Sequence, residues 1–230
     1  MSELGYMKEA VASVRAKMLA AEERSGNTGV TLLAAVKYTD TEHILELGRL
    51  GVRDVGENRV QQLLSRYEEM KAAGLTIHFI GTLQTNKVKY IIDKVTMIHS
   101  LGSVALAKEI EKQAAKHDIV MPVLVEINSG EEESKSGFLP DEAGAFCETI
   151  SAYPHLKLCG FMTMAPKCEE KEEYRKFFQR TSQQCLDIWQ KKLHNIGRPI
   201  LSMGMSDSYE IAIEEGATIV RVGRALFEKE

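Results

Sequence analysis

The chain has 230 residues, of which 44% are hydrophobic and 27% charged, and its net charge is −4 at pH 7. This composition is typical of an ordinary soluble globular protein and excludes a disordered or fibrous one. Acidic and basic residues are interspersed along the expected helices, as in Lys108, Glu109, Glu111 and Lys112, and no polybasic block is present, so we expect no nucleic-acid partner. The length allows either two small domains or one large α/β barrel.

The N-terminal residues Met1–Gly5 include an acidic residue and no apolar run. We therefore expect neither a secretory signal nor a membrane span, and a cytoplasmic protein. The cysteines show no CxxC pair and no metal-like spacing with histidine, which predicts free thiols in a reducing compartment and no metal site. They are Cys147, Cys159, Cys168 and Cys185.

A helix is expected from about Ser2 to Glu23, because apolar residues recur at helical spacing at Val11, Val14, Met18 and Leu19. The glycine-containing stretch 25–29 ends it. The next segment, Leu32–Val36, is apolar without alternation, which predicts a short strand buried on both faces that ends in Lys37.

An ammonium at the end of a buried strand is costly unless it is paired, neutralised or covalently modified, although most such lysines extend into solvent. After Lys37, Thr39 and Glu42 have the spacing of a capping box, and the helix that follows is expected to end at Gly51. Strand, turn and helix then repeat. The further expected strands are 52–55, 77–80, 95–99, 119–127, 156–163, 198–203 and 218–222. The further expected helices are 59–73, 85–93, 103–117, 140–153, 169–194 and 208–215.

Eight short strands joined through helices predict a parallel sheet, because parallel neighbours need crossover connections. A closed (β/α)8 TIM barrel is the simplest such fold. The competing doubly wound sheet would ordinarily carry GxGxxG after its first strand, and this chain has Lys37–Asp40 there. No linker or repeat divides the sequence, so one domain over residues 1–230 is expected. The polar loop Glu131–Gly137 is either a lid or a solvated connection, and we favour the connection.

Active groups of such a barrel lie at the C-terminal ends of the strands, and phosphate is commonly bound by the loops after strands seven and eight. Here those loops are Ser202–Ser206 and Gly223 with Arg224, and Lys37 follows the neighbouring first strand. Small residues and hydroxyls suit an anion, although helix caps, a turn glycine and a surface arginine would look the same. Together they predict a phosphate site facing Lys37, with a phosphorylated aldehyde or ketone as ligand.

Arg221 stands in an otherwise apolar strand and must find an acceptor or water. Pairing with a carboxylate such as Glu57 is the preferred interpretation from sequence. If Arg221 instead faces the ligand, it would donate to a ring nitrogen and keep that nitrogen unprotonated, which weakens the ring as an electron sink.

Several longer motifs carry a resemblance. They are Ala35–Lys37, Gly56–Asn58 with Val60 and Gln61, His78–Lys87, Lys135–Phe138, Gly160–Met164, Leu201–Asp207 and Val220–Gly223. On these residues the sequence resembles the pyridoxal phosphate homeostasis protein family, of the YggS and PROSC type, over nearly its whole length. That family is related to the barrel of bacterial alanine racemase, which belongs to fold type III of the proteins that depend on pyridoxal 5'-phosphate (PLP).

The resemblance implies that Lys37 holds PLP as a covalent Schiff base. It also implies that Asn58 lies near the ring, that Arg221 faces the pyridine nitrogen, and that the phosphate is contacted by Ser202, Met203, Gly223 and Arg224. This sequence departs from many members at Val36, where a serine or threonine is common, and at Arg224, where threonine is common. The second departure leaves the backbone amide of residue 224 as the expected phosphate donor.

The resemblance further implies a regulator of intracellular PLP, vitamin B6 and amino-acid balance, without established catalytic turnover. A racemase of this fold needs a second acid/base, supplied in the related enzyme by a tyrosine from an additional C-terminal domain, and this sequence ends at Phe227–Glu230. Transient transfer to PLP-dependent apoenzymes and a monomeric state are expected. The alternative is a Schiff-base enzyme: an aldolase or lyase that uses Lys37, or a residual amino-acid racemase.

Overall fold

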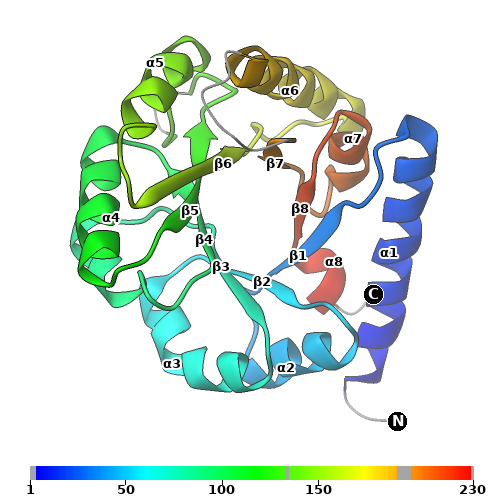
Figure 1. Ribbon diagram of the computed structural model, residues 1–230. Helices are drawn as coiled ribbons and strands as arrows, with labels where there is room; N and C mark the ends of the chain where they lie inside the picture. The colour runs from blue at the N-terminus through cyan, green and yellow to red at the C-terminus, as the bar shows by residue number, and fades with distance from the viewer. Residues whose placement is uncertain (1–3, 133–134, 191–197, 229–230) are drawn as a thin grey trace.

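The computed structural model of the chain describes residues 4–132, 135–190 and 198–228. Eight parallel strands pair in chain order and close into a barrel surrounded by helices (Figure 1). The strands are β1 (Thr31–Ala35), β2 (Asp54–Glu57), β3 (Thr76–Phe79), β4 (Met97–Leu101), β5 (Met121–Ile127), β6 (Leu156–Thr163), β7 (Ile200–Ser202) and β8 (Ile219–Val222). The predicted barrel is confirmed.

The helices lie on the outside of this barrel, and two of the helical segments are 3-10 turns. They are α1 (Gly5–Ser25), α2 (Thr41–Arg49), α3 (Val60–Ala72), η1 (Thr85–Tyr90), α4 (Val104–Lys116), α5 (Pro140–Ile150), η2 (Lys171–Glu173), α6 (Tyr174–Gln190), α7 (Tyr209–Glu214) and α8 (Arg224–Phe227). No helix among the described residues is long and apolar enough to cross a membrane.

Alternation along each strand separates two apolar regions. Leu33 on β1 packs with Ile80 and Ile219 in a small cluster, whereas its neighbour Ala34 joins the main core. Because successive side chains of a strand point to opposite faces, the small cluster lies inside the barrel and the main core lies between barrel and helices. One side of each strand therefore packs against the helices, and the other side faces the interior of the barrel.

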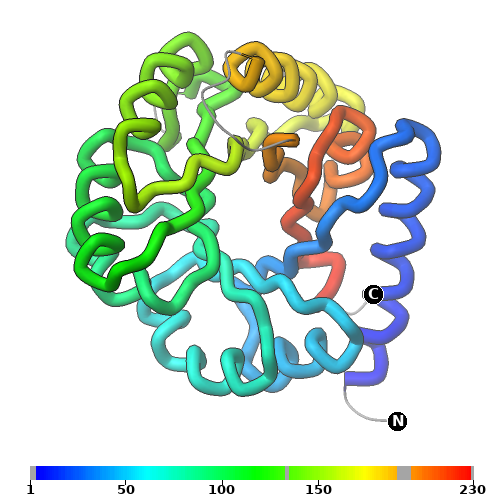
Figure 2. Tube along the Cα trace, viewed as in Figure 1, coloured from blue at the N-terminus to red at the C-terminus, as the bar shows by residue number. Residues whose placement is uncertain are grey.

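The barrel closes between β1 and β8, where Leu33 is in register with Arg221 and Ala34 with Val222. Figure 2 shows the N-terminal helix beside the C-terminal segments, in agreement with the contacts of α1 with α7 and α8. The Tyr6 hydroxyl donates to the Phe227 carbonyl at 3.1 Å and ties these segments together. The first and last strands of the chain are thus neighbours.

Several predicted boundaries differ from the structure. β2 begins two residues later than predicted, at Asp54, so Gly56 and Glu57 belong to the strand and not to a turn. Asp40, and not Thr39, is the N-cap of α2, because its carboxylate accepts from the His43 amide at 3.0 Å. The stretch after residue 84 forms a 3-10 turn where a helix was predicted.

Other differences lie at the helices. Leu19 is 58% exposed, because the buried face of α1 follows Val11, Val14 and Met18. The short helix α8 was not predicted. The predicted start of α1 at Ser2 and the predicted continuation of α6 through 191–194 lie outside the described residues.

Candidate functional site at the mouth of the barrel

Lys37 lies two residues beyond the end of β1, in a turn, and not at the end of the strand as predicted. Its side chain is half-buried, and its Nζ is 4.5 Å from the centre of the Tyr38 ring. A hydrogen bond with Lys37 lowers the pKa of the exposed Tyr38 phenol. The amine therefore stands at the C-terminal mouth of the barrel, where the sequence analysis expected chemistry.

A buried arginine from α3 holds the turn that carries Lys37. The Arg66 guanidinium donates to the Val36 carbonyl at 2.8 Å and to the Thr39 carbonyl at 2.7 Å. Its Nε donates to a Glu57 carboxylate oxygen at 2.5 Å. Because one planar group binds a carbonyl on each side of Lys37, the position of the turn is fixed by a single side chain.

Glu57 is wholly buried and forms the ionic partner of Arg66. Burial raises the pKa of its carboxyl, and the bond from Arg66 partly offsets this increase. Its second oxygen, Oε2, has no hydrogen-bond partner among the described residues. The preferred sequence interpretation, a pair between Glu57 and Arg221, is wrong, since Glu57 points outward from β2 toward α3.

Arg221 points into the barrel from β8. Its guanidinium donates to the Ser202 carbonyl at 2.6 Å, to the Ser202 hydroxyl at 2.8 Å and to the Thr163 carbonyl at 2.8 Å. Desolvation lowers the pKa of Arg221 to about 10, and the nearby Glu126 carboxylate acts in the opposite direction. Arg221 therefore remains a cation at neutral pH, held in place by oxygens that are themselves uncharged.

Two residues predicted to contact phosphate lie deeper than expected. Ser202 is wholly buried, and its hydroxyl lies between Arg221 and the ring of His99. Met203 is also buried, and its amide donates to the Ile219 carbonyl at 3.1 Å. Contact of these two residues with phosphate stays a prediction.

Two backbone amides offer a better-placed anion site. The amides of Gly223 and Ala225 donate to the Ser206 hydroxyl at 3.3 and 3.4 Å. A Cβ on Gly223 would lie 3.0 Å from the Ala35 carbonyl, so a side chain at this position would crowd the approach of β8 to β1. Amides from the loop after β8 and a hydroxyl from the loop after β7 together suit a phosphate group. Ser206 ends the loop Ser202–Ser206 in which the sequence predicted a phosphate site, although it was not among the individual residues expected to contact PLP.

Arg224 pairs with Asp207, and both side chains are exposed. This contact turns the guanidinium toward the rim of the mouth. Asn58 directly follows β2 and is half-buried. Its backbone packs so closely on Gly81 that a Cβ on that glycine would lie 2.2 Å from the Asn58 oxygen. Asn58 thus lies at the mouth, and its place near the PLP ring stays a prediction.

A further carboxyl, Glu126, lies under the loop after β5. The Ser136 hydroxyl donates to it at 2.8 Å, and the Phe138 amide donates to its backbone carbonyl at 2.8 Å. Burial raises the pKa of Glu126, against the effects of Ser136 and Arg221. The described part of the loop Glu131–Gly137 is therefore attached to β5 and is not a fully solvated connection.

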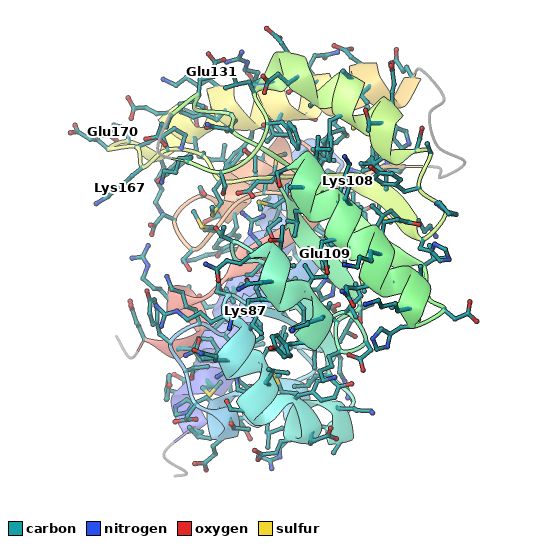
Figure 3. The ribbon with its side chains drawn as sticks, turned by 90° about the vertical axis from the view of Figure 1, so that its left-hand side faces the viewer. Lys87, Lys108, Glu109, Glu131, Lys167 and Glu170 are labelled. Carbon is teal, nitrogen blue, oxygen red and sulfur yellow. The ribbon has the colours of Figure 1, made fainter. Side chains whose placement is uncertain are left out.

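The rim of the mouth carries charges of both signs. In Figure 3, Glu131, Lys167 and Glu170 extend from the side of the molecule on which the loops after the strands lie, whereas Lys108 and Glu109 lie on the flank formed by α4. Among the residues that the structure describes, no group of three or more histidine, cysteine or acidic side chains is arranged to hold a metal ion.

Comparison with known proteins shows the family of the chain. A family model described as alanine racemase, N-terminal domain, matches residues 10–229. The pyridoxal phosphate homeostasis protein of Aquifex aeolicus is 46% identical over 202 residues, which cover 88% of each chain. That of Pseudomonas aeruginosa is 34% identical over 226 residues, which cover 97% of this chain and 96% of the relative.

Solved structures show the same fold. PipY of Synechococcus elongatus, a structure with PLP bound, has a TM-score of 0.84 and 28% identity over 96% of this chain and 100% of its own. The alanine racemase of Clostridium difficile shares the barrel, with a TM-score of 0.66, 18% identity, and coverage of 93% of this chain and 56% of its own. The chain belongs to the pyridoxal phosphate homeostasis protein family, whose barrel is that of the alanine racemase N-terminal domain.

Proposed function

We propose that the chain binds PLP at the mouth of the barrel, with Lys37 as the amine that forms a Schiff base with the cofactor aldehyde. We further propose that it holds and releases PLP without catalytic turnover and so contributes to vitamin B6 and amino-acid homeostasis. The names of the curated relatives and the PLP-bound structure of PipY support the ligand. The finer assignment is supported by one observation, which is that β1 and β8 are neighbours, so that Lys37 after β1 lies on the same seam as Arg221 on β8 and the backbone amides of Gly223 and Ala225 after it.

The residues fit the chemical groups of PLP. The amides of Gly223 and Ala225 with the Ser206 hydroxyl suit its phosphate. Lys37 suits its aldehyde, because a primary amine in the turn after β1 can condense with a carbonyl to form a Schiff base. Bound PLP supplies an aldehyde that captures amines and a pyridine ring that can accept electrons.

Arg221 supports a role without turnover. A guanidinium has donors and no acceptor, so a ring nitrogen that faces it stays unprotonated. The three bonds to Ser202 and Thr163 hold this donor, and Arg221 keeps its proton at neutral pH because its pKa remains near 10. An unprotonated pyridine is a weak electron sink, which disfavours carbanion chemistry at a bound amino acid.

The decisive experiment is an absorption spectrum of the purified chain before and after addition of PLP. We expect a visible Schiff-base band and, after borohydride reduction, a mass increment on the peptide that contains Lys37. Lys37→Ala should lose both, whereas Lys108→Ala, which changes an exposed lysine on α4, should keep both. Absence of the band and of the increment from the unmodified chain would refute the proposal.

The same preparation tests turnover. Alanine and serine incubated for a long time with the PLP-loaded chain should show no more racemisation than with Lys37→Ala. Racemisation that depends on Lys37 would favour the enzyme alternative. Trapping of a sugar phosphate on Lys37 in preference to PLP would favour an aldolase or lyase.

We also propose that the chain acts as a monomer in the cytoplasm and that apoenzymes accept its PLP. The mixed charges of the rim suit transient contacts. Light scattering after gel filtration should give the mass of one chain. An added PLP-dependent apoenzyme should recover its activity when it is mixed with the loaded chain. Recovery no faster than with the concentration of free PLP that is in equilibrium with the loaded chain would count against direct transfer.

A further inference from the structure

A line of hydrogen-bonded side chains crosses the interior of the barrel from β2 to β8. His78 Nε2 lies 3.2 Å from an Asp54 carboxylate oxygen, and His78 Nδ1 lies 2.9 Å from His99 Nε2. His99 Nδ1 lies 3.0 Å from the Ser202 hydroxyl, which accepts from Arg221 at 2.8 Å. We call this line of five residues the interior relay.

The interior relay joins solvent on one face of the barrel to the candidate site on the other. His99 and Ser202 are wholly buried, whereas the Asp54 side chain is 30% exposed. Asp54 borders a groove of about 450 Å³ that is formed by α1 and the segments before β1 and β2. Only the Asp54 end of the relay is therefore open to water.

The Asp54 end of the relay determines the direction of its hydrogen bonds. An ionised Asp54 can only accept, so a neutral His78 carries its proton on Nε2 and donates it to Asp54. His78 Nδ1 then accepts from His99 Nε2, and His99 Nδ1 accepts from the Ser202 hydroxyl. Arg221 can only donate, so it occupies one acceptor site of that hydroxyl and leaves its hydrogen free for His99.

The opposite direction fails for neutral rings. If His99 carried its proton on Nδ1, its Nε2 would have to accept from His78 Nδ1, and His78 Nε2 would then face the Asp54 carboxylate with two acceptors in contact. A second proton on the histidine pair removes that clash. Burial, His78 and Arg221 together lower the pKa of His99 well below its ordinary value, which keeps this ring neutral.

Other titratable groups face the relay from the surrounding strands. Glu126 on β5 interacts with Arg221, and burial raises its pKa. Cys159 on β6 lies in the interior cluster with Met97 and Met162, and burial raises its pKa as well. Among the residues that the structure describes, neither of them hydrogen-bonds into the line from β2 to β8, and His78 and His99 connect Asp54 with Ser202.

We propose that Asp54, His78 and His99 are positioning residues of the PLP site, which fix the Ser202 hydroxyl and the Arg221 guanidinium in one donor arrangement. The role of these residues at the PLP site rests on the proposed function. The tautomers of His78 and His99 do not depend on it. In this arrangement the Ser202 hydroxyl donates its single hydrogen to His99, so it cannot also donate to a phosphate. Phosphate donation then falls to Ser206 and to the amides of Gly223 and Ala225.

The tautomers can be measured without PLP. Long-range correlation of ring protons with nitrogen in histidine-labelled chain at pH 7.5 distinguishes Nδ1–H from Nε2–H, and the variants His78→Asn and His99→Asn assign the signals. We expect both rings to carry their proton on Nε2. An Nδ1–H tautomer at either ring would overturn the relay direction.

The coupling to the ligand can be measured with Asp54→Asn, which changes a partly exposed residue on the far face and keeps its shape. Removal of the negative end of the relay disfavours the charged Schiff base. We expect PLP to bind about threefold more weakly. The pH at which half of the visible Schiff-base absorbance is lost should fall by roughly 0.3 to 0.5 unit. Asp93→Asn, which changes an exposed carboxylate paired with Lys94, is the matched control and should leave both values unchanged.

The outcomes separate the two proposals. Unchanged PLP affinity and an unchanged midpoint in Asp54→Asn would overturn the coupling, while the proposed function would stand. A chain that binds no PLP would refute the proposed function and, with it, the positioning role. The tautomer measurement would then still decide the direction of the relay.

Discussion

Two buried arginines lie on opposite sides of the barrel wall, and their partners differ. Arg66, in the layer between barrel and helices, pairs with the ionised side chain of Glu57 and with two carbonyls of the Lys37 turn. Arg221, inside the barrel, is bound by two carbonyls and a hydroxyl. The charge of Arg66 is balanced by the carboxylate of Glu57, whereas the hydrogen-bond partners of Arg221 are uncharged and leave its positive charge unbalanced.

This difference indicates separate roles. A buried ion pair is costly to break, because the remaining partner is left as an uncompensated charge. A buried cation with neutral partners is instead suited to interact with a ligand that supplies a lone pair or negative charge. Arg66 should therefore govern folding and the position of Lys37, and Arg221 should govern the ligand.

The largest effect is expected for Arg66→Met. The substitution leaves Glu57 buried and unpaired and removes the donors of the Val36 and Thr39 carbonyls. We expect a loss of about 3 to 5 kcal/mol in the free energy of unfolding, measured with urea. Arg49→Met removes an exposed pair with Glu46 and should cost less than about 1 kcal/mol.

A double variant separates charge burial from the position of the turn. Glu57→Leu combined with Arg66→Leu removes both charges and should recover much of the lost stability. The Val36 and Thr39 carbonyls still lose their donor, so PLP should bind more weakly than in the unmodified chain. Normal PLP binding by the folded double variant would show that Arg66 does not position Lys37.

The reverse pattern is expected for Arg221→Met. Its neutral partners lose hydrogen bonds, which should cost about 1 to 3 kcal/mol of unfolding free energy. PLP affinity should fall about tenfold or more, since one charge-assisted bond is worth about 1.5 to 3 kcal/mol. Titration followed by absorbance measures this loss. Affinity within twofold of the unmodified chain would contradict the assigned role.

The interior also predicts a pH dependence. Native His99 stays neutral, while an unfolded histidine binds a proton below about pH 6.5. The unfolded state therefore binds more protons in acid, and stability is lost as the pH falls below about 6.5. When the pH is lowered from 7.5 to 5.5, the free energy of unfolding of the unmodified chain should fall by about 1.4 kcal/mol more than that of His99→Gln. Equal losses in urea unfolding would show that His99 is protonated in the native chain.

The smallest effect is expected for Arg224→Ala. The Arg224 side chain pairs with Asp207 on the surface, and such pairs contribute about 0 to 1 kcal/mol. We expect PLP affinity to change by about twofold or less, because we propose that the backbone of this loop, and not the Arg224 side chain, contacts the phosphate. A tenfold loss, with Asp207→Ala unaffected, would place the guanidinium on the phosphate.

The sequence was sufficient for the barrel, because eight apolar strands with capped helices between them allow few other arrangements. It also predicted that Lys37 and Gly223 lie at one mouth, since parallel strands align their C-terminal ends, whereas the place of Asn58 came from the family resemblance. The predictions of the barrel and of the place of Lys37 and Gly223 depend on chain order and periodicity alone. Neither depends on which side chains meet.

The pairing of side chains was the part that sequence could not supply. Arg66 looks like a surface residue of a polar helix, yet it is 6% exposed and binds Glu57. The contact between His78 and His99 depends on the register of β3 with β4, which the sequence does not show. Periodicity assigns a residue to a face of its element, while a hydrogen bond also needs the position of a second element.

The seam between β1 and β8 has a consequence for folding. Its partners in register, such as Thr31 and Ile219, lie at opposite ends of the sequence, and contacts of such high sequence separation form late because loop closure opposes them. Lys37 follows one strand of the seam, and Arg221 belongs to the other. A partly folded chain therefore has both groups and no site, and acquisition of PLP in a refolding reaction would time the closure of the barrel.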